Sequence, residues 1–223
     1  MPRPITISRS AEGGGPGRAC RPGLGPFAVG DGGAAGYTLV ELVFVTGLLV
    51  TVSGMAVPQL LSVLDDYRTA GAARYVSARM QRARMEAITR SVEAAVHFTP
   101  VGAGYSYAVY RDGNDNGVLT KDVQSGADPR IGWIERLSDH FSGVEFGAQP
   151  GLPAVDPGSI APGNDPIRLG PSNMASFSWK GTATSGSVYI KGRHAQYVVR
   201  IFGTTAKTRV LKFDRVAKQW KPL

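Results

Sequence analysis

The residues with the clearest potential for chemistry form an oxygen-rich run that begins at Asp112. Side-chain oxygens occur at its first, third and fifth positions and a glycine at the sixth, which is the spacing of a calcium-binding loop. The twelfth position, which normally carries a bidentate acid, is Val123. Aspartate and asparagine beside glycine also build ordinary turns. We expect a tight turn here, with calcium binding as the alternative. The candidate side-chain ligands are Asp112, Asn114, Asn116 and Asp122, which comes one residue early for the acid position.

Basic residues supply the second candidate chemistry. The chain carries a formal net charge of +8 at pH 7, and from Lys180 to Leu223 the only acid is Asp214. Such a concentration of cations can contact phosphates, with an affinity that depends little on base sequence and falls steeply with salt. Tyr197, Phe213 and Trp220 would add base stacking where they are exposed. The alternative is a basic surface that meets acidic protein neighbours or lipid headgroups.

The side chains do not form a pattern that is typical of an enzyme. His97, His140 and His194 are scattered without metal-ligand spacing, and no glycine-rich phosphate loop precedes a predicted helix. The single cysteine is Cys20, close to the N-terminus. We therefore expect the chain not to be a catalyst.

An isolated carboxylate, Glu41, is the only charged residue between Tyr37 and Val57. A helix over 37–57 would be roughly 30 Å long, which matches the core of a bilayer. We predict a transmembrane helix there, with a buried soluble helix as the alternative. Because an ionised carboxylate costs about 2.5–3.5 kcal/mol at the membrane centre, and less near its surface, Glu41 needs a partner. A cut after Gly36 would create one, since the new α-amino group of Tyr37 could pair with Glu41 of a neighbouring helix.

The run Gly36-Tyr37-Thr38-Leu39-Val40-Glu41-Leu42-Val43 resembles the type III signal of type IV prepilins and of type II secretion pseudopilins. The resemblance implies that a prepilin peptidase cuts between Gly36 and Tyr37 and methylates the new N-terminus. It also implies that Glu41, fifth in the mature chain, guides subunit docking in a filament. Pro58 falls where many pilins bend this helix. The family usually has phenylalanine at the first mature position, where this chain has tyrosine.

Residues 1–36 would then be a cleaved leader and have no part in the mature fold. Its excess of arginine over acidic residues predicts a cytoplasmic leader, an inner-membrane anchor and a periplasmic C-terminal body. Cys20 would be lost with the leader, so the mature chain would contain no disulfide. Because 36 residues is long for such a leader, the true translation start could lie downstream of Met1.

The remaining pattern predicts an α+β domain. Val76, Met80, Ala83 and Ala87 recur at helical spacing, so a helix should continue over 58–90 with these residues facing the core. Residues 91–223 then read as a β-rich headgroup, with a surface loop between Gln149 and Ser172. The predicted strands are Val92–Thr99, Tyr105–Arg111, Ile131–Leu137, Gly143–Phe146, Ala175–Trp179, Ser187–Lys191, Gln196–Phe202 and Thr208–Asp214.

Two further segments resemble GspH/FimT minor pseudopilins. They are Arg82–Ile88 in the predicted helix and the Phe177–Ile190 stretch with its Trp179-Lys180-Gly181 turn. The family fold is one long N-terminal helix packed on a β-rich globular head, which agrees with the periodicity. The implied function is a minor pilin or pseudopilin of a type II secretion or type IV pilus filament, whose partners are the peptidase, other pilins and membrane lipid.

Some FimT-type members bind DNA in natural transformation through a C-terminal Gly-Arg-x-Arg motif. Here the comparable place reads Ala206-Lys207-Thr208-Arg209, so the glycine is missing and a lysine replaces one arginine. The loss of one bidentate guanidinium weakens this alternative. The candidate DNA contacts are Lys207, Arg209 and Lys212.

Overall fold

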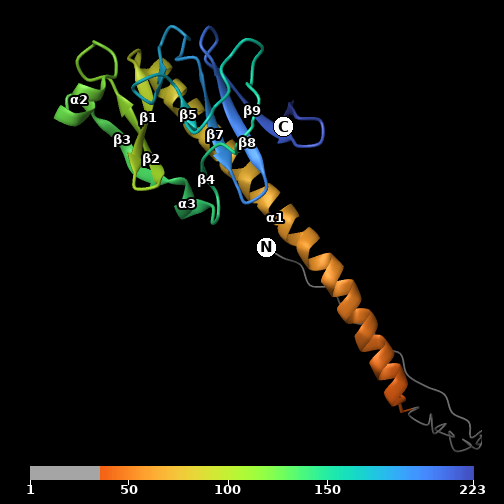
Figure 1. Cartoon of the computed structure of the whole chain (residues 1–223). Coiled ribbons are helices and arrows are strands. Elements are labelled where there is room, and N and C mark those ends of the chain that lie inside the picture. The colour runs from red at the N-terminus through yellow and green to blue at the C-terminus, as the bar shows by residue number, and fades with distance from the viewer. Residues whose placement is uncertain (1–35) are drawn as a thin grey trace, which may run out of the picture. The chain divides into compact units, whose positions relative to one another are not determined.

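The structure, a computed structural model, describes residues 36–223. The expected leader, with Cys20, therefore lies outside the described residues except for Gly36. The chain divides into two compact units, which meet between Thr46 and Gly47. Helix α1 (Leu39–Arg90) begins in the first unit and continues through the second, and the rest of the second unit is an antiparallel β domain (Figure 1). The α+β class is thus confirmed.

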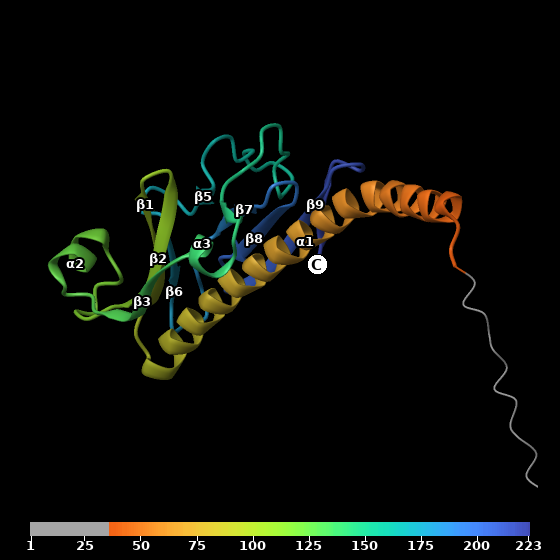
Figure 2. The same cartoon turned by 90° about the horizontal axis from the view of Figure 1, so that it is seen from below.

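The part of α1 beyond Leu64 packs through a stripe of mostly small side chains. Val76, Met80, Ala83 and Ala87 are all at most 1% exposed, which confirms the predicted core face. Thr69, Ala72 and Ala73 extend the stripe by two turns towards the N-terminus. Because alanine side chains are short, the helix backbone can lie close to the sheets that it covers. Figure 2 shows this half of α1 running along the strands.

The strands form two antiparallel sheets. Sheet A has the order β3-β2-β1-β6, and sheet B has the order β10-β9-β8-β7-β4, with β5 paired to β7. The strands of sheet A are β1 (Ala94–Val101), β2 (Gly104–Arg111), β3 (Arg130–Arg136) and β6 (Met174–Phe177). Those of sheet B are β4 (Glu145–Phe146), β5 (Ile167–Arg168), β7 (Gly186–Lys191), β8 (Gln196–Phe202), β9 (Lys207–Asp214) and β10 (Gln219–Pro222). Two short helices, α2 (Thr120–Ser125) and α3 (Leu137–His140), flank β3 in the chain.

All eight predicted strands overlap strands of the structure, while β5 and β10 were not predicted. Strand β5 has only two residues and lies inside the region predicted as a loop, too short to show alternation. Strand β10 follows a tight turn after β9 and buries only one side chain in part, that of Trp220.

One hydrophobic core joins α1 to both sheets. Met80 of α1, Phe98 of β1 and Ile190 of β7 belong to the same buried cluster. A smaller cluster lies on the other face of sheet B, where Leu152 covers Tyr189 and Val198. Sheet B is therefore covered on both faces near its centre, which explains why β7 and β8 are almost continuously buried.

Candidate functional site

The first unit contains the start of α1 and the predicted processing site. The helix begins at Leu39, and Thr38 is its N-cap: the Glu41 N–H donates to Thr38 Oγ1 at 3.2 Å, and the Leu42 N–H donates to the Thr38 carbonyl at 3.0 Å. Gly36 and Tyr37 precede the helix, belong to no helix or strand, and are exposed. A carboxylate in the first turn is favourable beside the partial positive charge of a helix N-terminus. The capping role of Thr38 was not predicted from the sequence.

The Glu41 side chain is exposed and forms no ion pair among the described residues. Every side chain from Leu39 to Leu64 is exposed as well. Within residues 36–223, α1 is the one helix long and apolar enough to cross a membrane; its most apolar 18-residue window has a mean hydropathy of 2.0 and no buried residue. Within the second unit, the β domain therefore leaves the side chains of residues 47–64 uncovered.

Two aspartates end this apolar run and fasten the β domain to α1. Asp65 accepts three backbone N–H donors from the β7–β8 turn, those of Arg193, His194 and Ala195, at 2.9, 2.7 and 3.0 Å. Burial raises the pKa of the Asp65 carboxyl, but the three donors outweigh burial and the pKa is lowered. This stabilisation is therefore present above the unfolded pKa and is lost as the pH falls through the lower folded pKa. Asp66 accepts bonds from Tyr197 Oη at 2.9 Å and Lys212 Nζ at 2.7 Å.

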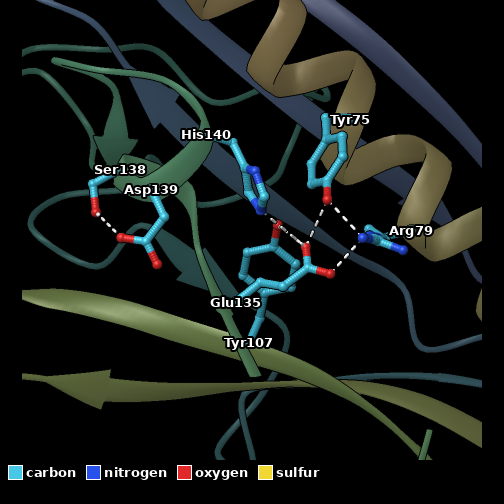
Figure 3. Close-up of polar contacts among 7 residues, drawn as sticks. All are labelled: Tyr75, Arg79, Tyr107, Glu135, Ser138, Asp139 and His140. Atoms are coloured by element: carbon cyan, nitrogen blue, oxygen red, sulfur yellow. Dashed lines mark hydrogen bonds and ion pairs between the residues drawn. The ribbon is translucent and has the colours of Figure 1, made fainter. Parts of the chain in front are cut away.

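A polar cluster centred on Glu135 of β3 makes a second connection to α1 (Figure 3). Its carboxylate accepts Tyr75 Oη at 2.8 Å and Tyr107 Oη at 3.1 Å, and it pairs with the Arg79 guanidinium. Arg79 also donates to Tyr75 Oη at 2.6 Å, and His140 Nε2 lies 3.8 Å from Glu135. Burial, and then the negative charge of Glu135, raises the pKa of Tyr107, so both tyrosines remain hydrogen-bond donors. The cluster joins groups that are already paired, which is the arrangement of a structural clamp rather than of a nucleophile and its base.

The four predicted calcium ligands do come together, but as the hydrogen-bond partners of a turn. Asp112 accepts the N–H groups of Asn114 and Gly117 at 3.0 and 2.8 Å. Asn114 and Asn116 direct their side-chain amide nitrogens at Asp122 Oδ2, at 3.4 and 3.0 Å. In this arrangement the two amides act as hydrogen-bond donors to Asp122.

Asp128, which was not predicted, completes the same turn. It is 1% exposed and accepts the N–H groups of Gly113 and Leu119, each at 3.1 Å. A Cβ on Gly113 would lie 2.1 Å from the Ala127 carbonyl oxygen, so this position requires glycine. Within residues 36–223, His, Cys, Asp and Glu side chains do not gather in a metal-binding group of three or more. The geometry favours the turn, and calcium binding stays a prediction.

Replacement of Asp128 by alanine separates the two interpretations of this loop. The change removes a buried carboxylate that accepts two backbone N–H groups of exposed residues, so we expect the free energy of unfolding to fall by about 1–2 kcal/mol. Urea denaturation of the detergent-solubilised chain, with calcium and with a chelator, should give the same loss. Asp128→Asn keeps one acceptor and should lose less. If calcium instead raises the melting temperature of the wild type and Asp112→Ala removes that rise, the loop binds the metal.

The predicted DNA-contacting residues lie on β9 but do not share one face. Side chains alternate along a strand, so Lys207 and Arg209 point to one side and Lys212 to the other. Lys212 faces α1, where it pairs with Asp66 at 2.7 Å. Lys212 thus belongs to the junction with α1, while Lys207 and Arg209 lie on the opposite face of the strand, and DNA binding by the three residues stays a prediction. Tyr197 is 1% exposed, and Phe213 and Trp220 are half-buried in the cluster around Tyr189, which removes Tyr197 as a stacking platform.

Two arginines that sequence analysis missed join Lys207 and Arg209. Arg200 of β8 pairs with Arg209 of β9 on one side and with Ser187 of β7 on the other. Ser187 in turn pairs with Arg168 of β5, so the three arginines lie in one line across the sheet. The Arg209 and Arg200 guanidinium carbons lie 5.4 and 5.8 Å from the ring centroid of Phe202. We call Arg168, Arg200, Lys207 and Arg209 the arginine row. Arg200 also pairs with Asp156 at 2.5 Å, so part of the charge of the row is already neutralised.

Comparisons with family models, with curated proteins and with solved structures give no match for this chain. Its function must therefore be argued from the geometry just described.

Proposed function

We propose that the chain is a minor pilin or pseudopilin, a structural subunit of a type II secretion or type IV pilus filament. The observation that carries the proposal is the N-terminal part of α1. A glycine and an aromatic residue precede a capped helix start with one acid, Glu41, in its first turn, and apolar side chains then stay exposed as far as Leu64. The layout of one long apolar helix followed by an antiparallel β domain is compatible with a pilin.

The exposed apolar run needs two successive coverings in this proposal. Before assembly the run lies in the inner membrane, with the leader in the cytoplasm and the β domain in the periplasm. After assembly it packs against the corresponding helices of neighbouring subunits. A Cβ at Gly47 or Gly54 would meet nothing within 4 Å, so both positions are open to a close helix neighbour.

The processing chemistry belongs to another protein. A prepilin peptidase would cut between Gly36 and Tyr37 and methylate the new amine, which then pairs with Glu41 of the adjacent subunit. Head-to-tail contacts of this kind are heterologous and need not close, so they build a helical fibre. The chain itself acts as a substrate and a building block, with no catalytic role.

The filament assignment is tested by mechanical shearing. The tagged chain is expressed in a host that assembles the filament, cells are sheared, and the released filaments are separated from membranes and blotted. The proposal expects the processed chain in the filament fraction, and its retention in the membrane fraction alone would contradict the proposal. A host without the peptidase is the control, since the unprocessed precursor should stay in the membrane.

The arginine row favours a second candidate, a minor pilin that captures DNA. Its cations follow one face of sheet B at neighbouring strands, and phosphate contacts of this kind give affinity without base specificity. The guanidinium groups of Arg200 and Arg209 lie over the aromatic ring of Phe202.

Mutation of the row distinguishes DNA capture from a purely structural role. Lys207→Ala combined with Arg209→Ala should abolish a mobility shift of duplex DNA at low salt and reduce the salt dependence of binding. Lys212→Ala is a control on the same strand. It removes one positive charge from the opposite face and should change binding little. A wild-type chain that shifts no DNA at low salt would eliminate this candidate.

A further inference from the structure

The base of the β domain, where α1 leaves its apolar run, carries a group of basic residues that the filament contacts above do not use. Arg68 of α1, Arg193 and His194 of the β7–β8 turn, and Arg215 after β9 are all exposed. We call these four residues the basal rim. They differ from the arginine row in position and in neighbours.

Hydrogen bonds show which part of α1 lies beside the rim. The backbone N–H groups of Arg193 and His194 bind Asp65, the residue directly after Leu64. The Arg215 guanidinium donates to the His194 carbonyl and, at 2.7 Å, to Gln149 Oε1. A hollow of about 650 Å³ lies at the same level, and Ser62 and Val63 of the apolar run form part of its wall together with Arg215.

The apolar run reaches up to this point without a further charge. Between Glu41 and Asp65 no residue is charged, and the side chains of 47–64 are exposed in the second unit. At about 1.5 Å per residue, one helical turn separates the last apolar side chains from Arg68. With a bilayer core of about 30 Å over 37–57, a headgroup layer roughly 5–7 Å thick ends near residue 62, so the rim lies within about 10 Å of the headgroups, which is one Debye length.

The charges of the rim are free to meet an anion. Asp65 is occupied by three N–H donors and Asp66 by Tyr197 and Lys212. Arg68, Arg193 and Arg215 form no ion pair with a carboxylate among residues 36–223. Because Asp65 holds the turn through backbone groups only, the side chains of Arg193 and His194 remain available.

We propose that the basal rim binds the anionic lipid headgroups of the bilayer that the apolar run crosses, and so holds the β domain against the membrane before assembly. The inference rests on the membrane insertion in the proposed function. Basic residues next to a membrane exit are attracted by anionic lipid over about one Debye length. Extraction into a filament then has to break these contacts, which keeps the unassembled subunit at the membrane surface.

The test follows one fluorescent label on the full chain in lipid vesicles. Cys20→Ser is combined with Pro150→Cys, because Pro150 is exposed and lines a second hollow, of about 480 Å³, together with Arg193 and Arg215. Vesicles of phosphatidylcholine, with or without one quarter phosphatidylglycerol, carry a spin-labelled headgroup that quenches the label. We expect about twofold stronger quenching with the anionic lipid, and loss of the difference at high salt.

Two variants with equal charge loss make the result specific. Arg193→Ala with Arg215→Ala should remove the increase in quenching, whereas Lys207→Ala with Arg209→Ala should leave it. A label at Thr204, three residues before β9, serves as the distant control. Thr208 of β9 contacts Ser77, and Ser77 lies about 18 Å further along α1 than Asp65, so this end of β9 is far from the rim.

Equal quenching in both lipids, or an unchanged increase in the Arg193 and Arg215 variant, would overturn the inference. Carbonate extraction of the same vesicles separates the two claims: a retained chain without the lipid effect refutes only the rim, while a released chain refutes membrane insertion as well.

Discussion

Replacement of Glu41 by alanine should leave the chain in the membrane and remove it from the filament. Insertion is not impaired, because the substitution removes a carboxylate that costs up to about 3 kcal/mol in the bilayer. In the proposed filament, assembly would lose the acceptor for the α-amino group of Tyr37 on the next subunit. Loss of one partner of a buried charge pair costs about 2 kcal/mol or more, which corresponds to an incorporation reduced about 30-fold. Shearing and blotting give the filament fraction, and carbonate extraction gives the membrane fraction.

Two conservative variants show whether the effect of Glu41 depends on its charge. Glu41→Gln keeps the size and a hydrogen-bond acceptor but loses the charge, so it should resemble the alanine variant. Glu41→Asp keeps the charge on a shorter side chain and should incorporate in part. Incorporation of the alanine variant at the wild-type level would contradict the assembly role of this residue.

The largest effect on folding is expected at Glu135. Its side chain is 14% exposed, and it is the acceptor for Tyr75 and Arg79 of α1 and for Tyr107 of β2. Glu135→Ala leaves the Arg79 charge without a counter-ion in a partly buried place, which should lower the free energy of unfolding by about 2–3 kcal/mol. For a chain of this size that corresponds to a fall in melting temperature of roughly 5–10 °C. Thermal unfolding of the detergent-solubilised chain, followed by circular dichroism, measures it.

A double-mutant cycle assigns this loss to the clamp between β3 and α1. Arg79→Leu combined with Glu135→Leu replaces both charges by apolar groups and should be less destabilising than the sum of the single changes. Arg130→Ala, at an exposed position on the same strand, is the control and should shift the melting temperature very little. Additive losses at the two sites would mean that the ion pair contributes no coupling.

The helix face and the positions of most strands could be predicted because they depend on local periodicity. Val76, Met80, Ala83 and Ala87 repeat at the helical period, and all four are buried as expected. In a strand the period is two residues, so along β9 the side chain of Lys212 points to the opposite face from those of Lys207 and Arg209. Alternation was therefore available in the sequence and could have shown that Lys212 lies on the opposite face from the other two cations.

Long-range partners could not be predicted from the sequence. Glu135 meets Tyr75 and Arg79 across 60 and 56 positions of the chain, and no local pattern indicates which helix face lies against β3. Asp128 lies beyond a twelve-residue calcium-loop template that begins at Asp112, so the template could not include it. Arg200 belongs to the arginine row only because of the register between β8 and β9.

The central claim is that the chain is cut between Gly36 and Tyr37 and then built into a filament. The mass of the N-terminal peptide of the filament-associated chain tests this claim most directly. Filaments are sheared from cells, the subunit is isolated, and its N-terminal peptide is analysed by tandem mass spectrometry. The account predicts a chain that begins at Tyr37 and carries one methyl group on its α-amino nitrogen. A chain that retains Gly36 and the residues before it, or that begins at another position, would contradict the account.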